Sequence, residues 1–83
     1  MSTEILTREV VEAAYVTALF KLEEIVSVPG SMQSKNVNDG RKQIEKFWNK
    51  FVENENNREN NRDPALHVIT LAKSISDWHE SVM

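Results

Sequence analysis

Two histidines and a few acidic pairs are the side chains with the most potential for catalysis or metal binding in this 83-residue sequence. His67 and His79 are twelve residues apart, too far to bind one metal ion from adjacent turns of a helix. Neither lies in an H-E-x-x-H or E-x-x-H pattern, and the pair Glu23 and Glu24 has no such histidine partner. We therefore expect no metal ion and no cofactor, and we interpret the glutamates as solubilising charges.

Nucleophilic catalysis also lacks its usual sequence context. With no cysteine and two glycines, the chain has neither a thiol nucleophile nor a G-x-S-x-G turn or a glycine-rich phosphate-binding loop. We predict that the protein is not an enzyme. The lack of cysteine also excludes disulfides and thiolate zinc sites. A chain this short must therefore gain its stability from helix packing or from self-association.

Three lysines form the only basic pattern with regular spacing. Lys42, Lys46 and Lys50 follow one another at four-residue intervals, which would place them on one helix face able to contact phosphates. The net charge of −3 disfavours nucleic acid as a partner, and such a row is more often a solvated face. Association with nucleic acid through these lysines is kept as the alternative function.

Membrane insertion and export are not indicated. No stretch approaches the roughly 20 apolar residues that a membrane-spanning helix needs, and the N-terminus shows no basic region followed by an apolar run. We expect a soluble protein of the cytoplasm that does not bind membranes.

The elements that would position these side chains are helices, and the first is the most apolar. It is predicted over about residues 4–27, with Thr7 as the preferred N-cap. Its core stripe has spacings of three and four and consists of Val11, Ala14, Tyr15, Ala18, Leu22 and Ile25. The opposite side is apolar as well, at Ala13, Val16 and Phe20. Either the other two helices cover both faces, or this second face is left to bind a protein or a second copy.

Two further helices are predicted, over about 40–57 and 64–82. The second has a regular apolar face, with Asn38 or Asp39 as its cap; the face consists of Ile44, Phe47, Trp48, Phe51 and Val52. The third is expected to start with Asp63 as N-cap and Pro64 as the first helical residue. Its core stripe is Val68, Leu71, Ala72, Ile75 and Val82, with Trp78 on one flank.

Polar linkers are predicted over 28–39 and 58–63. Pro29 and Gly30 are expected to end the first helix, and residues 32–40 read as a loop that could hold one helical turn. The stretch 54–63 has no apolar residue, so we expect it to bury nothing and to be a mobile loop or a frayed helical extension.

These patterns predict an all-α, single-domain protein, a small three-helix bundle that self-associates through its first helix. We expect a non-catalytic protein-binding module, a regulator, inhibitor or adaptor, that acts by stoichiometric association of a helix face and forms a homodimer. The predicted protein-binding residues are Ala13, Val16, Phe20 and Trp78. Trp78 is included because a half-buried tryptophan is a frequent anchor of protein interfaces.

Overall fold

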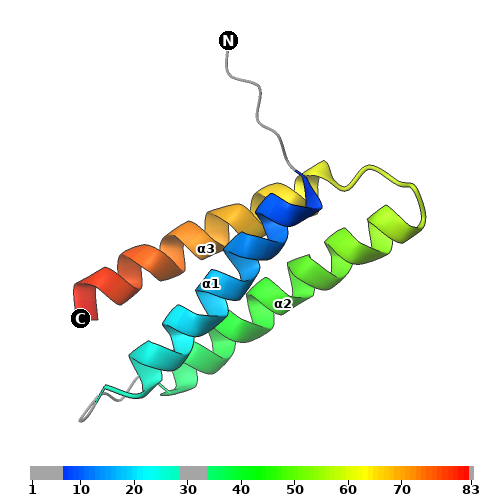
Figure 1. The fold of residues 1–83 in the computed structure, drawn as a ribbon. Helices are drawn as coiled ribbons and strands as arrows, with labels where there is room; N and C mark the ends of the chain where they lie inside the picture. The colour runs from blue at the N-terminus through cyan, green and yellow to red at the C-terminus, as the bar shows by residue number, and fades with distance from the viewer. Residues whose placement is uncertain (1–6, 29–33, 83) are drawn as a thin grey trace.

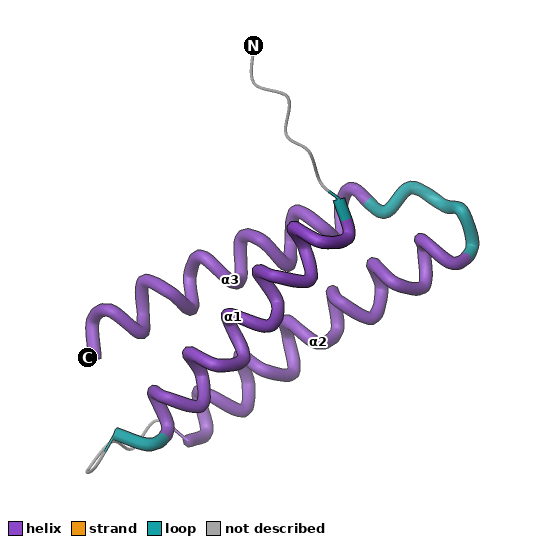
Figure 2. Tube along the Cα trace, viewed as in Figure 1, coloured by secondary structure: helices purple, strands orange, loops and turns teal. Residues whose placement is uncertain are grey.

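Three helices account for almost all of the chain that the structure describes. The computed structural model describes residues 7–28 and 34–82, and in these ranges the elements are α1 (Arg8–Val26), α2 (Ser34–Asn56) and α3 (Arg62–Val82). Figure 1 shows them lying lengthwise beside one another, and Figure 2 shows the loop that joins α2 to α3. The predicted all-α three-helix bundle is confirmed for these residues.

Helix α1 begins as its sequence predicts. The Thr7 hydroxyl accepts a hydrogen bond from the Val10 amide at 3.3 Å, and Glu9 lies in the first turn, where a carboxylate suits the positive end of the helix dipole. The helix ends at Val26, and the C-cap is Ser27, whose amide donates to the carbonyl of Glu23 at 3.1 Å. Residues 4–6 and the predicted stop at Pro29 and Gly30 lie outside the described residues.

Helix α2 starts earlier than the sequence patterns indicated. It begins at Ser34, so the predicted linker over 34–39 is wrong, and Asn38 and Asp39 lie inside the helix instead of capping it. The physical reason is Val37, which is 1% exposed and packs in the core. Burial of this side chain stabilises the additional turns, although Asn36 to Gly40 has the composition of a turn.

The connection from α2 to α3 is better ordered than its composition suggested. Asn54 is buried, and its amide group donates to the backbone carbonyl of Asn60 at 3.0 Å, so the prediction that residues 54–63 bury nothing is wrong. Arg58 has a positive φ of 58°, and the Glu59 amide donates to the Asn54 carbonyl at 2.7 Å. This six-to-one bond around a left-handed residue is a Schellman motif, which closes the end of α2.

Helix α3 also starts earlier than predicted. Its first helical residue is Arg62, and the Ala65 amide donates to the Asn61 carbonyl at 3.1 Å, which makes Asn61 the capping position. Asp63 and Pro64 are thus within the first turn and not at its boundary. Proline is tolerated there, because the amides of the first turn have no intrahelical partner.

The helices run up, down and up. Two contacts of the same sequence offset join α1 to α3, Lys21 Nζ to Ser76 Oγ at 3.1 Å and Glu24 Oε1 to His79 Nε2 at 3.3 Å, so these helices are parallel and α2 is antiparallel to both (Figure 1). All three helices contact one another around a single core. Its members that are at most 1% exposed are Val11, Ala18, Leu22, Ile25, Val37, Ile44, Phe51, Ala65 and Val68.

Candidate functional site

In the described part of the chain, the large apolar side chains that are exposed all lie on α1; Val10 and Val26 lie on its flanks, and Val16 and Phe20 lie on the side that faces away from the other helices. Phe20 is 64% exposed and Val16 is 42% exposed, and Ala13 is exposed as well. We call these three residues the α1 strip. At 100° per residue the strip lies about half a turn from the buried stripe of Val11 and Leu22. Of the two packing arrangements open to the sequence, the structure has the one in which α2 and α3 share one face of α1.

Two shallow hollows meet at the centre of the α1 strip. One, with a volume of about 180 Å³, is lined by Val16, Leu19, Phe20 and Glu23. The other, of about 330 Å³, is lined by Glu9, Glu12, Ala13 and Val16. Because both contain Val16, they form one track along the helix. Such a track fits side chains from another polypeptide better than it encloses a small molecule.

The charges that border the α1 strip are negative. Glu9, Glu12 and Glu23 line the hollows, and all three are exposed. Both basic residues of α1 also make contacts with the other helices. Lys21 donates to Ser76 of α3, and Arg8 donates to Glu55 Oε1 of α2 at 2.8 Å, while the Arg8 guanidinium lies 6.0 Å from the centre of the Trp48 ring.

Only Glu12 of this border has a basic neighbour within the helix. Arg8 Nε lies 3.8 Å from Glu12 Oε2, and both side chains are about half exposed, so the contact is screened by water. The surface around the strip therefore keeps a negative character at neutral pH.

Trp78 belongs to a different part of the molecule. It is partly buried and packs against the hydrophobic core from α3, as its flanking position in the sequence pattern indicated. It does not line either hollow of the α1 strip. Its role in protein binding therefore stays a prediction, and Trp78 is not part of the α1 strip of Ala13, Val16 and Phe20.

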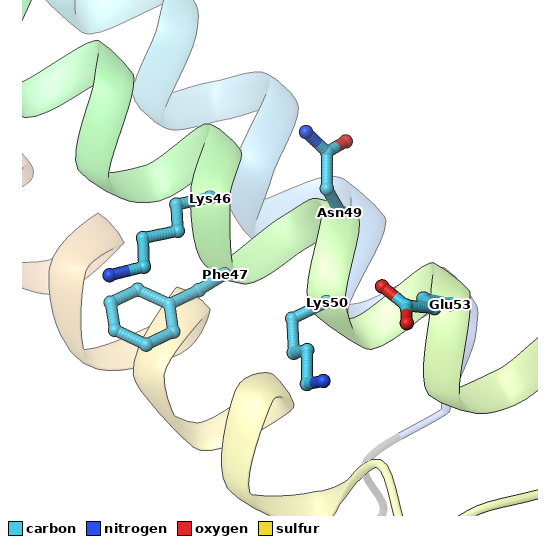
Figure 3. Close-up of a pocket in the computed structure, with 5 residues that line it drawn as sticks. All are labelled: Lys46, Phe47, Asn49, Lys50 and Glu53. Carbon is cyan, nitrogen blue, oxygen red and sulfur yellow. The ribbon is translucent and has the colours of Figure 1, made fainter.

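The lysine row lies on the exposed side of α2. Lys42, Lys46 and Lys50 are all exposed, and a hollow of about 340 Å³ is lined by Lys46, Phe47, Asn49, Lys50 and Glu53. Figure 3 shows Lys46 and Lys50 on either side of Phe47, with Asn49 directed to the other side and Glu53 next along the helix. Lys42 does not line the hollow. The carboxylate of Glu53 within it lowers the attraction for phosphate.

Aromatic contacts between helices were not resolved by the sequence pattern. Phe47 stacks on His67 of α3 with ring centres 4.4 Å apart, and Tyr15 of α1 stacks on Trp48 of α2 at 4.9 Å with ring planes 7° apart. These aromatic residues were assigned to helix faces from their spacing, which does not specify the ring that each one meets across a helix boundary. His67 Nδ1 also lies 2.9 Å from the backbone carbonyl oxygen of Asp63.

Neither metal chemistry nor a membrane segment is indicated by the described part of the chain. No group of three or more His, Asp or Glu side chains in residues 7–28 and 34–82 is placed to hold a metal ion. Across the same ranges, each helix falls short of the combined length and apolar content that a membrane crossing requires. Comparison with protein-family models, with curated proteins and with solved structures finds no match for this chain.

Proposed function

We propose that this protein is a non-catalytic binding module that associates stoichiometrically with another polypeptide through the α1 strip. The observation that carries the proposal is the 64% exposure of Phe20 on a helix whose opposite face already supplies the core. Phe20 lies outside the hydrophobic core of the single chain, while burial of a phenylalanine side chain against a partner would contribute up to about 1.5–3 kcal/mol. The regulator, inhibitor or adaptor role follows from binding without catalysis, and the absence of cysteine suits work in the reducing cytoplasm.

The partner in this proposal is another protein or a second copy of the chain. Multi-angle light scattering on a size-exclusion column separates these two forms, because a homodimer doubles the mass of the eluting species. Binding of nucleic acid through Lys42, Lys46 and Lys50 remains the alternative, and it predicts an affinity that falls steeply with salt. If fluorescence did not change when nucleic acid was added at low salt, this alternative function would be excluded.

Phe20→Gln tests the proposal with little disturbance of the fold. Glutamine is a good helix former without charge, so the free energy of unfolding should change by less than about 0.5 kcal/mol. Affinity capture from the cells that produce the protein should then lose the partner that the unchanged chain retains.

Two control variants make this test specific. Lys50→Gln alters the exposed α2 face and should leave capture unchanged. Phe51→Ala removes a fully buried ring and should cost about 3–5 kcal/mol of stability. If Phe20→Gln captured the same partner as the unchanged protein, or unfolded the chain as Phe51→Ala should, the α1 strip would not be the binding surface.

A further inference from the structure

We infer that the occupant of the α1 strip is a basic amphipathic helix of a different protein, an inference that rests on the proposed function and specifies its partner. The first argument is the shape of the surface. Ala13, Val16 and Phe20 form a narrow apolar row, and the residues from Glu9 to Glu23 span about 21 Å at 1.5 Å per residue. An amphipathic helix of about four turns has an apolar stripe of the same width and length.

The second argument is charge complementarity. Glu9, Glu12 and Glu23 border the row on α1. Lys21 donates to α3, and Arg8 donates to Glu55 of α2 while its Nε lies 3.8 Å from Glu12, so Glu9 and Glu23 are the border carboxylates without such a contact within α1. A partner helix that carries lysine or arginine beside its apolar stripe would place these cations next to the three carboxylates. Complementary rim charges accelerate association and exclude partners of the wrong sign.

The same charges argue against a second copy of this chain as the occupant. An antiparallel pairing that sets strip against strip brings Glu9 of one copy close to Glu23 and Glu24 of the other, at both ends of the contact. A parallel pairing about a two-fold axis instead places each glutamate beside its own equivalent. Like charges opposed in this way weaken the pairing at neutral pH, while they favour a basic partner.

The experiment measures binding of two labelled peptides by fluorescence anisotropy. One peptide is an amphipathic helix of leucine and lysine, and its matched counterpart replaces every lysine with glutamate. We expect the unchanged protein to bind the leucine–lysine peptide at least about tenfold more tightly than the leucine–glutamate peptide, and the preference to shrink as salt is added.

Three variants locate the binding. Phe20→Gln should weaken the leucine–lysine peptide about tenfold or more, because the exposed ring is its main apolar contact. Glu9→Lys combined with Glu23→Lys should weaken it about tenfold and raise affinity for the leucine–glutamate peptide. Glu59→Lys changes an exposed charge outside α1, in the connection before α3, and should have little effect.

The outcomes separate this inference from the proposed function. If both peptides bind equally and Phe20→Gln abolishes both, the strip binds helices but the basic partner is overturned. Failure of both peptides to bind, or binding that ignores Phe20→Gln and the double charge reversal, also overturns it. The proposed function is judged independently, by the capture experiment with Phe20→Gln and Lys50→Gln. A strip-dependent homodimer at neutral pH would keep the proposed function and reject the basic helix.

Discussion

At the scale of single residues, Arg58 has the least favourable backbone conformation in the described part of the chain. It is the only non-glycine residue there with a positive φ, and it occupies the position of the Schellman motif that glycine usually fills. The left-handed conformation costs a residue with a Cβ atom roughly 1–2 kcal/mol. The motif still forms, because it closes α2 with the 2.7 Å bond from Glu59 to Asn54.

Arg58→Gly should therefore stabilise the protein by about 1 kcal/mol. Urea denaturation followed by circular dichroism measures the change in the free energy of unfolding. The neighbouring variant Asn57→Gly is the control: its backbone does not have a positive φ, so it should bring no gain. A loss of stability in Arg58→Gly would mean that the left-handed turn does not form in solution.

Tyr15 should titrate above the ordinary tyrosine pKa of 10.0. Burial against the neighbouring helix raises the pKa of its hydroxyl, the carboxylate of Glu45 raises it further, and Arg41 partly opposes both. Because the folded pKa is raised, the contribution of the neutral Tyr15 hydroxyl to stability is fully present at neutral pH. It is lost as the pH rises from the unfolded pKa through the folded pKa, where the unfolded chain ionises first.

This titration can be read directly, because the chain contains one tyrosine. Tyrosinate absorbance of the native protein should rise at a higher pH than that of the protein in denaturant. Glu45→Gln should lower the native pKa partway toward its ordinary value. Coincident titrations of the native and denatured protein would show that Tyr15 is not packed as described.

At the scale of the helices, Gly40 lies in the interior of α2 and not at its start. A Cβ atom added there would lie 3.6 Å from Leu22 Cδ2, an ordinary van der Waals distance. Gly40→Ala should thus stabilise the protein by about 0.5–1 kcal/mol, because glycine is a poor helix former and the space is available. Thermal denaturation measures the gain.

The control for this prediction is Gly40→Val, whose branched side chain has to displace Leu22 and should remove the gain. The pair of variants also tests where α2 begins. If the helix started near residue 40, the glycine would serve a turn or a cap, and alanine would not be stabilising there. A destabilised Gly40→Ala would contradict the start at Ser34.

The three helices and most of their core faces could be predicted from sequence, because apolar residues at spacings of three and four form one continuous face only in a helix. Ile44 and Phe51 of α2 and Val68 and Ile75 of α3 are buried as that spacing indicates. The start of α2 was missed because Asn38, Asp39 and Gly40 have the local preferences of a turn. Val37, seven residues before Ile44, was the available signal, since this spacing continues the same helix face.

At the scale of the whole molecule, the α1 strip depends on where the other two helices pack. The sequence shows that α1 has two apolar faces, and it leaves open whether both are covered. Which face of α1 is covered depends on contacts between residues far apart in the chain, and the local spacing of apolar residues gives no information about these contacts. The structure places α2 and α3 on the Leu22 side, and Phe20 is consequently exposed.

The α1 strip also gives the molecule two chemically different surfaces. The α1 strip is apolar with an acidic border, whereas the α2 surface around Lys46 and Lys50 is basic and contains Glu53 as well. A binding partner of either sign would be directed to one of these sides by its charge. Locating the contact is therefore more informative than measuring an affinity alone.

Mapping of backbone amide chemical shifts locates the contact surface most directly. Isotope-labelled protein is titrated with the leucine–lysine peptide, and the shift of each amide signal is followed. We predict that the largest changes lie in α1 between Glu9 and Glu23, centred on Val16 and Phe20, while the amides from Lys42 to Lys50 stay unchanged. Changes concentrated on α2, or no changes at all, would contradict the α1 strip as the binding surface of this protein.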